Sequence, residues 1–204
     1  TTSEGPCSAG YYCPPGQTSV TPVPYRCPRG FYCPTGSAFP IPCENGTYQS
    51  QERKDFCDLC PAGLFCEQPN KSSGAHTPEL CPAGYFCPPG TNFSTEHPCP
   101  KGTFGPRTGA TSESDCEPCP AGMYCSAQGL SQPSGFCYPG YRCAKGAISP
   151  APFKHRVSVC PSGFYCPAGT GLELPCKPGT FSPVPGASVC LPCPAGTACS
   201  DAAT

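Results

Sequence analysis

The chain has no tryptophan, one methionine and few charged residues. Lys, Arg, Asp and Glu make up 12% of its 204 residues, and the formal net charge is −1. So little charge gives no electrostatic basis for binding nucleic acid or an anionic membrane. Proline or glycine interrupts nearly every window of ten residues, which excludes amphipathic helices. We find no signal peptide and no apolar stretch for direct membrane insertion.

Cysteine, in contrast, is abundant, with 22 residues beside 32 prolines and 24 glycines. Proline and glycine at this level suggest disorder, but a cysteine content above about 10% is typical of a disulfide scaffold. Disulfide-closed loops replace the hydrophobic core that small modules lack. Because cytosolic thiols are kept reduced, we expect the chain to be secreted, extracellular or at the cell surface. Since it begins with Thr1-Thr2, we also interpret it as a trimmed protein or a segment of a longer one.

A heptad of Cys, two residues, Gly, two residues and Cys occurs eight times. The copies start at Cys7, Cys27, Cys60, Cys81, Cys119, Cys137, Cys160 and Cys193. A second motif, in which Pro-Cys precedes a Gly-Thr-aromatic triplet, occurs three times, as Cys43–Cys57, Cys99–Cys116 and Cys176–Cys190. The two motifs together predict short and long modules at 1–26, 27–80, 81–136, 137–159 and 160–204, the last continuing beyond the segment.

The predicted fold class is a set of small disulfide-rich tandem repeats with almost no helix. We expect irregular chain with short two-stranded β ribbons, one of them beginning at each Gly-Thr-Tyr/Phe triplet. The heptad glycine suits a turn that needs a positive φ. Because each module would contact mainly its neighbours, the repeats should form an elongated rod.

The pairing of the cysteines is open in part, because sequence alone does not fix connectivity. The lone pairs Cys43–Cys57, Cys99–Cys116 and Cys176–Cys190 are the first expectation. For the heptads, one alternative links adjacent copies, as Cys60–Cys81 and Cys66–Cys87. The other, which the count favours, closes each heptad on itself, giving Cys7–Cys13, Cys27–Cys33, Cys60–Cys66, Cys81–Cys87, Cys119–Cys125, Cys137–Cys143, Cys160–Cys166 and Cys193–Cys199.

The sequence Cys-Pro-Ala-Gly-aromatic, followed by Cys-x-x-Gly-Thr-Tyr/Phe and Cys-x-x-Cys, resembles ephrin-receptor-like cysteine-rich repeats. It is more distantly similar to the cysteine-rich modules of tumour-necrosis-factor and growth-factor receptors. The resemblance covers nearly the whole chain and implies rods of receptors, matrix proteins or protist and algal surface appendages, including glycosylated filaments. It transfers no catalytic residue. The cysteine that closes each heptad departs from the usual repeat, so the pairing of that family is not carried over.

Three sequons at Asn45, Asn70 and Asn92 are candidate N-glycosylation sites. Thr47 of the first also belongs to a Gly-Thr-Tyr triplet. The Ser/Thr- and Pro-containing stretches 18–24, 149–152 and 182–185 are either O-glycan or hydroxyproline-glycan carriers or plain linkers. We expect no cofactor other than these covalent glycans.

Other polar groups have simpler interpretations than a catalytic or metal site. The Cys-x-x-Cys pairs lack the matching second pair of a zinc site. The three histidines, His76, His97 and His155, stand alone, and we expect them to be exposed. The acidic cluster Glu113, Asp115 and Glu117 lacks the spacing of a calcium loop. We therefore expect no enzyme and no metal.

Aromatic residues recur near the closing cysteine of the heptads. They either pack over the disulfide of their own module or form a stripe for assembly with other copies. The candidate stripe residues are Tyr12, Tyr32, Phe86, Tyr124 and Tyr165. The functional expectation is a non-catalytic structural glycoprotein that self-assembles, with other copies of itself as partner. The alternative is the ligand-binding or stalk region of a cell-surface receptor.

Overall fold

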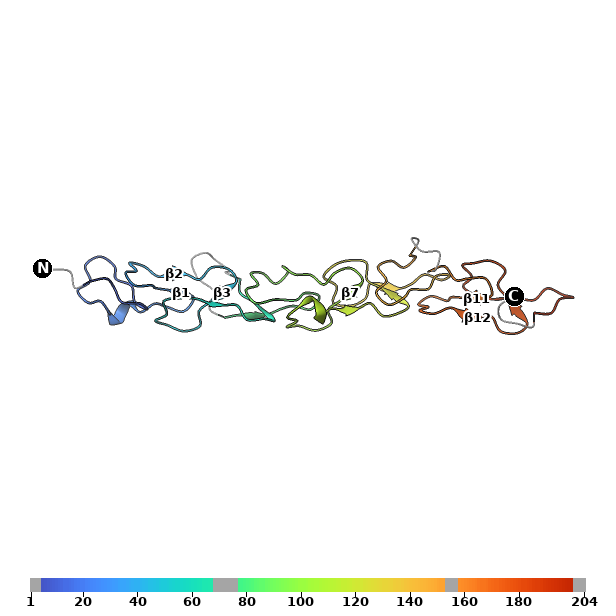
Figure 1. Cartoon of the computed structure of the whole chain (residues 1–204), viewed down its shortest axis with the longest axis horizontal. Coiled ribbons are helices and arrows are strands. Elements are labelled where there is room, and N and C mark those ends of the chain that lie inside the picture. Colours follow the sequence, from blue (N-terminus) through green and yellow to red (C-terminus); the bar gives the residue numbers. More distant parts are fainter. Residues whose placement is uncertain (1–4, 68–76, 153–157, 200–204) are drawn as a thin grey trace. The chain divides into compact units, whose positions relative to one another are not determined.

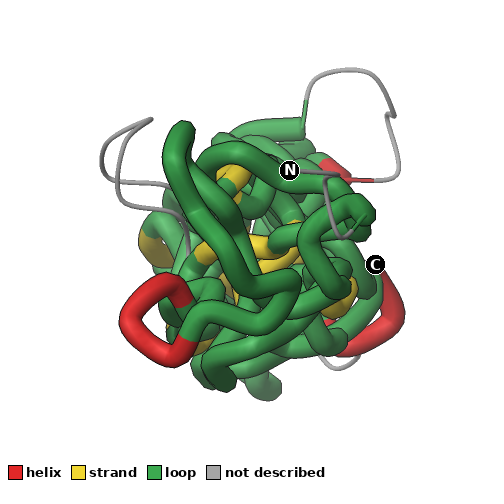
Figure 2. Tube along the Cα trace, turned by 90° about the vertical axis from the view of Figure 1, so that its left-hand side faces the viewer, coloured by secondary structure: helices red, strands yellow, loops and turns green. Residues whose placement is uncertain are grey.

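The computed structural model describes residues 5–67, 77–152 and 158–199. Loops and turns make up most of these residues, as Figure 2 shows. The helical elements that lie wholly within the described residues are two short 3₁₀ turns, η1 (Val23–Tyr25) and η2 (Glu113–Asp115). The predicted near-absence of helix is confirmed, because frequent proline and glycine leave no uninterrupted helical segment.

In the described residues the strands are all two residues long and form seven antiparallel two-stranded sheets. Figure 1 labels several of these strands, among them the pair β1 and β2. In pairing order they are β1 (Phe31–Tyr32) with β2 (Ile41–Pro42), β3 (Thr47–Tyr48) with β4 (Asp58–Leu59), β5 (Leu64–Phe65) with β6 (Glu79–Leu80), β7 (Thr103–Phe104) with β8 (Glu117–Pro118), β9 (Met123–Tyr124) with β10 (Gly135–Phe136), β11 (Phe164–Tyr165) with β12 (Leu174–Pro175), and β13 (Thr180–Phe181) with β14 (Leu191–Pro192). The predicted ribbons are therefore present, including those that begin at the three Gly-Thr-aromatic triplets.

The strand pattern defines a shorter repeat than the five predicted modules. Each repeat begins with Cys at position 1 and has Gly at position 4. The repeats start at Cys7, Cys27, Cys43, Cys60, Cys81, Cys99, Cys119, Cys137, Cys160, Cys176 and Cys193, and we number them 1 to 11. The predicted modules that follow the first one all start where one of these repeats starts.

A tight turn opens every repeat. The N–H of position 5 donates to the carbonyl of position 2, as from Phe31 to Pro28 at 3.2 Å and from Thr47 to Glu44 at 3.0 Å. The glycine between them has φ near +80°, for example +82° at Gly30. This is the geometry of a type II turn, whose third residue needs a positive φ. In seven of the eleven repeats, positions 5 and 6 then form the first strand of a hairpin.

Backbone hydrogen bonds also join consecutive repeats inside each of two compact units. The first unit comprises residues 1–97 and 108–112, and the second comprises 98–107 and 113–204. In the first unit, the N–H of Gly63 in repeat 4 donates to the carbonyl of Cys87 in repeat 5 at 2.8 Å. In the second, the N–H of Gly140 in repeat 8 donates in the same way to Cys166 in repeat 9 at 2.8 Å.

Several repeats also come into close backbone contact with the repeat two places further along the chain. A Cβ on Gly102 of repeat 6 would lie 2.7 Å from the carbonyl oxygen of Gly146 in repeat 8. A Cβ on Gly63 of repeat 4 would lie at the same distance from the carbonyl oxygen of Gly109 in repeat 6. In these repeats the position-4 glycine is thus required both for its φ and for the absence of a side chain, whereas a Cβ on Gly179 or Gly196 would meet nothing within 4 Å.

Eleven disulfides pair all 22 cysteines, one disulfide in each repeat. Of the two alternatives for the heptads, the structure has the local one. Each heptad closes on itself, and Cys43, Cys99 and Cys176 bond to Cys57, Cys116 and Cys190. Most half-cystines are buried, and they form the greater part of the buried apolar residues. The disulfides therefore take the place of a hydrophobic core in each repeat.

Repeats 3, 6 and 10 lack a cysteine at position 7 and close a longer loop instead. Position 7 is Gln49, Gly105 and Ser182 in these repeats. Gln49 is fully buried and Ser182 is 2% exposed. The Gln49 side-chain amide donates to the Phe56 carbonyl at 3.1 Å and to Asp58 at 3.3 Å, and its Oε1 accepts from the N–H of Gln51 at 3.0 Å. In repeats 3 and 10 a buried, hydrogen-bonded polar side chain thus occupies the place that a half-cystine has elsewhere, whereas repeat 6 has a glycine there.

The local pairing makes a direct prediction for disulfide mapping. Trypsin cleavage after Lys71 in the unfolded, unreduced chain should separate the fragments on its two sides, because no disulfide spans that bond. Mass spectrometry before and after reduction measures this. Under the interlocked alternative, Cys60–Cys81 and Cys66–Cys87 would hold the two fragments together until a reductant was added.

Arg53 is the one described residue other than glycine with a positive φ, at +63°. Its N–H donates to the Cys27 carbonyl at 2.8 Å. Gly109 of repeat 6 and Gly186 of repeat 10 make the equivalent hydrogen bonds, to the carbonyls of Cys81 and Cys160. Its guanidinium lies 5.1 Å from the centroid of the Tyr11 ring. The side chain therefore gains a cation–π contact, worth about 0.5–1 kcal/mol, in a backbone conformation that costs about 1–2 kcal/mol without glycine.

Substitution at Arg53 separates these two effects. Arg53→Ala loses the Tyr11 contact and keeps the backbone strain, whereas Arg53→Gly loses the contact and removes the strain. After allowing for the greater freedom of glycine in the unfolded chain, Arg53→Gly should be more stable than Arg53→Ala by about 0.5–1 kcal/mol. Urea unfolding of the two variants measures the difference. Equal stabilities would show that the turn imposes no strain at this position.

Candidate glycosylation and assembly sites

Asn45 lies at the tip of the turn that opens repeat 3. The turn runs from Glu44 to Thr47, with Gly46 at φ +78° as its third residue. Asn45 is exposed. The Thr47 hydroxyl donates to the Glu44 carbonyl at 2.8 Å, so the sequon threonine also stabilises the turn. The structural role expected for this triplet is thus compatible with an asparagine that faces solvent.

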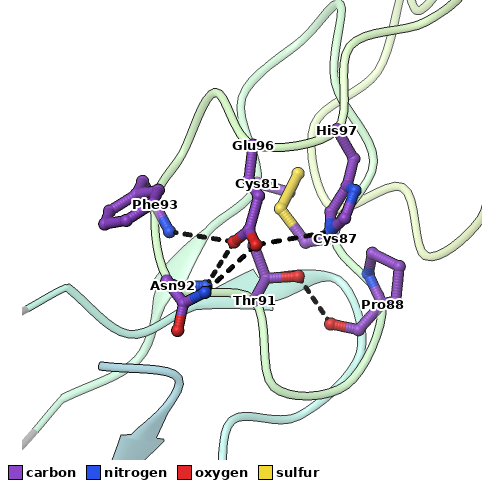
Figure 3. A network of polar contacts seen from close by, with 8 residues as sticks. All are labelled: Cys81, Cys87, Pro88, Thr91, Asn92, Phe93, Glu96 and His97. Atoms are coloured by element: carbon purple, nitrogen blue, oxygen red, sulfur yellow. Dashed lines mark hydrogen bonds and ion pairs between the residues drawn. A yellow bond between two sulfur atoms is a disulfide. The ribbon is translucent and has the colours of Figure 1, made fainter. Parts of the chain in front are cut away.

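Asn92 has a different environment, because its side chain belongs to a polar network in repeat 5 (Figure 3). Its backbone N–H donates to Glu96 Oε2 at 2.7 Å, and its side-chain amide donates to Glu96 Oε1 at 3.0 Å. The N–H of Phe93 adds a longer contact of 3.4 Å to the same carboxylate. Asn92 is half-buried. The carboxylate of Glu96 therefore fixes the orientation of this sequon asparagine. The third sequon residue, Asn70, lies outside the described residues.

The network shifts the titration of Glu96. Burial alone would raise its pKa, but the hydrogen bonds from Asn92 and Phe93 outweigh it, and the nearby His97, 3.9 Å away, adds an attraction when it is protonated. The net effect lowers the pKa of Glu96 below its ordinary value. Figure 3 shows this carboxylate between the Asn92 amide and the His97 ring, close to the Cys81–Cys87 disulfide.

A lowered pKa predicts acid sensitivity of repeat 5. The folded state favours the ionised carboxylate, so its stabilisation is present above the unfolded-state pKa of about 4.3 and is lost as the pH falls through the lower folded value. Glu96→Gln should weaken the loss of stability below about pH 4 that the unmodified chain shows. Thermal unfolding followed across this range measures it. Glu79→Gln, at an exposed strand position, is the control, and an equal effect of both variants would contradict the prediction.

A second carboxylate lies between repeats of the second compact unit. Glu173 of repeat 9 accepts from the guanidinium of Arg142 in repeat 8, and both side chains are about three-quarters buried. The N–H of Glu173 itself lowers the pKa of this carboxyl, burial opposes the shift, and Arg142 adds to it. This ion pair stabilises the junction of the two repeats in addition to the backbone hydrogen bonds.

The five candidate stripe residues are all half-buried rather than exposed. The Tyr12 ring packs edge-on against Tyr25 at a centroid distance of 5.3 Å, and Phe86 stacks on His97 at 5.5 Å. These two aromatics thus contact partners in their own repeat. The role of the five candidate stripe residues in assembly stays a prediction.

Some of the large exposed apolar residues lie on the second strand of the hairpins. Six of the seven second strands carry one, namely Ile41, Leu59, Leu80, Phe136, Leu174 and Leu191, which we call the returning-strand residues. Leu59, Leu80 and Phe136 lie over Gly90, Gly109 and Gly169 two repeats further on, yet each remains at least 60% exposed. Sequence reasoning missed this set, although its signal was an apolar residue one or two places before the first cysteine of most repeats.

The remaining candidate groups form no cluster. Among the residues that the structure describes, no three His, Cys, Asp or Glu side chains lie together as metal ligands would. Glu117 of the acidic cluster instead pairs with Arg107 at 3.5 Å, and His97 is in the Glu96 network. His76 and His155 lie outside the described residues. No helix in the described part of the chain is long and apolar enough to cross a membrane.

Some serine hydroxyls in the Ser- and Pro-containing stretches make hydrogen bonds within the fold. The Ser182 hydroxyl is buried and donates to the Val184 carbonyl at 3.2 Å. The Ser149 hydroxyl contacts both the carbonyl and the N–H of Ala151 at 3.3 Å. In 18–24, the Ser19 hydroxyl accepts from the N–H of Thr21 at 3.2 Å. Ser182 is therefore a poor O-glycan carrier, whereas Thr18 and Thr21 are exposed.

Comparison with known proteins does not assign the chain to a family. No family model matches the chain, and no curated protein is significantly similar to it. The class that the structure defines is a protein of disulfide-rich irregular repeats, consistent with an oxidising, extracellular environment. The resemblance to ephrin-receptor-like repeats stays a prediction.

Proposed function

We propose that this chain is a non-catalytic extracellular structural glycoprotein. Its disulfide-stabilised repeats would assemble with other copies of the chain into a filament, a surface appendage or a matrix. The observation that supports this most is that the same backbone bonds and one disulfide recur in each repeat along the described chain. A chain that presents similar surfaces repeatedly favours open, non-closing contacts between copies, which produce fibres.

The exposed apolar side chains add a second argument. The returning-strand residues recur from repeat to repeat, with exposed fractions from 39% for Ile41 to 65% for Phe136. Single exposed apolar residues are ordinary, but a recurring set supplies a recurring contact for a second copy. The exposed sequon residue Asn45 supplies a site for a glycan, which helps to keep a chain with few charges soluble.

Electron microscopy of the natively isolated, glycosylated protein under non-reducing conditions tests the proposal. Regular filaments with an axial repeat are expected. Leu191→Ser, at a half-exposed returning-strand position, should reduce the assembled fraction, whereas Ser162→Ala should not. Dispersed monomers at high concentration would reject self-assembly and favour the alternative, a ligand-binding or stalk region of a cell-surface receptor.

A further inference from the structure

A hollow of about 230 Å³ opens beside the turn of repeat 3. Its lining residues are Tyr32, Glu44, Thr47, Asp55, Phe56 and Cys57. All of them belong to the first compact unit. Drug-sized ligands occupy pockets of about 300–1,000 Å³. The hollow is therefore suited to a smaller group, of the size of a single ring.

The lining combines two aromatic rings with two carboxylates. Phe56 is 53% exposed and Tyr32 is half-buried, so each retains ring surface for a contact. The carboxylates of Glu44 and Asp55 are exposed acceptors. A pyranose has an apolar C–H face that packs on aromatic rings and hydroxyl groups that donate to carboxylates. An ammonium group is the competing ligand class, but the Lys54 ammonium, 5.8 Å from the centroid of the Phe56 ring, would repel a second cation and not a neutral sugar.

The position of the Asn45 sequon identifies the source of the sugar. Asn45 lies at the tip of the turn from Glu44 to Thr47, and both end residues of that turn line the hollow. A glycan on Asn45 therefore starts within two residues of two parts of the lining. We propose that the first sugar of an Asn45-linked glycan occupies this hollow and packs against Phe56 and Tyr32. This rests on the proposed function only in requiring a glycosylated chain.

The bound sugar would cover the loop that closes repeat 3. The Cys43–Cys57 disulfide joins the end of this loop to the start of the repeat. A hydrogen bond from the Gln49 side-chain amide to the Phe56 carbonyl joins the two ends of the segment between them. A sugar between Phe56 and Glu44 bridges the two sides of this loop. The glycan thus has a structural role in repeat 3 beyond solubility. No residue of the Asn92 sequon lines this hollow.

The test compares four full-length forms secreted from a host that attaches N-glycans: the unmodified chain, Asn45→Gln, Phe56→Ala and the double variant. Mass spectrometry first measures occupancy of Asn45, which should be high. Phe56→Ala should then lower the unfolding midpoint by about 2–4 °C more with the glycan than in the Asn45→Gln background, because it removes one aromatic contact in a chain of this size. In an Asn92→Gln background its cost should be unchanged.

A second measurement covers the case in which Asn45→Gln fails to fold. Ring protons of the first Asn45-linked sugar should shift upfield in the NMR spectrum of the glycosylated chain, because they lie over aromatic rings. The shift should disappear in Phe56→Ala. An unoccupied Asn45, equal costs of Phe56→Ala in both backgrounds, or unshifted sugar protons would overturn the proposal. Each of these outcomes is separate from the presence or absence of filaments, which tests the proposed function.

Discussion

Gly122→Ala is expected to destabilise the second compact unit by about 2–5 kcal/mol, or to prevent its oxidative folding. Gly122 has φ +84°, where an alanine costs about 1–2 kcal/mol. A Cβ at this position would also overlap the carbonyl oxygen of Gly169, two repeats further on. Since that oxygen belongs to the backbone, relief requires a shift of the repeat, and overpacking of this kind costs about 1–3 kcal/mol.

Gly16→Ala is the matched control for this prediction. Gly16 has a similar φ of +90°, but a Cβ there would meet nothing within 4 Å. It should therefore show only the backbone cost of about 1–2 kcal/mol. Urea unfolding and the yield of correctly oxidised protein measure both variants. Equal losses of stability in the two variants would mean that repeat 7 does not approach repeat 9 as closely as the structure shows.

The sequence was informative about what happens inside a repeat. Local pairing of the disulfides, the ribbons at the Gly-Thr-aromatic triplets and the turn at the heptad glycine all depend on residues within about twenty positions. Each has a local signal, since a Cys-x-x-Gly-x-x-Cys segment fixes both the turn and the separation of its sulfur atoms. Such short-range constraints do not depend on how the rest of the chain folds.

Contacts between repeats were harder to predict from the sequence. The bond from Gly63 to Cys87 and the approach of Gly102 to Gly146 involve backbone atoms, which leave no residue-type signature other than glycine. The heptad glycines were recognised only as turn residues. The hollow beside Asn45 was also missed, because it combines Tyr32 of repeat 2 with Glu44, Asp55 and Phe56 of repeat 3. Its parts are separated by loops whose course the sequence does not specify.

The equivalence of Gln49 with a half-cystine leads to the second large expected effect. Gln49→Ala should destabilise repeat 3 by about 2–4 kcal/mol, because it leaves a cavity and removes the bonds to Phe56, Asp58 and Gln51. Gln49→Glu should cost at least as much, since it buries a carboxylate beside that of Asp58. Gln51→Ala, which alters an exposed side chain and keeps the backbone bond, should change stability by less than about 0.5 kcal/mol. Denaturant unfolding of the three variants compares them.

A rescue experiment tests the register behind this prediction. Cys57→Ser removes the partner of Cys43, and loss of a disulfide in a small module costs about 2–5 kcal/mol. If position 7 of repeat 3 lies where the other repeats have their closing cysteine, Gln49→Cys in that background should form a disulfide between Cys43 and the introduced thiol, which peptide mapping would detect. Much of the lost stability should then return, because the heptad of repeat 2 closes with the same spacing. A free Cys43 in the double variant, or a Gln49→Ala variant as stable as Gln51→Ala, would show that Gln49 does not replace a half-cystine.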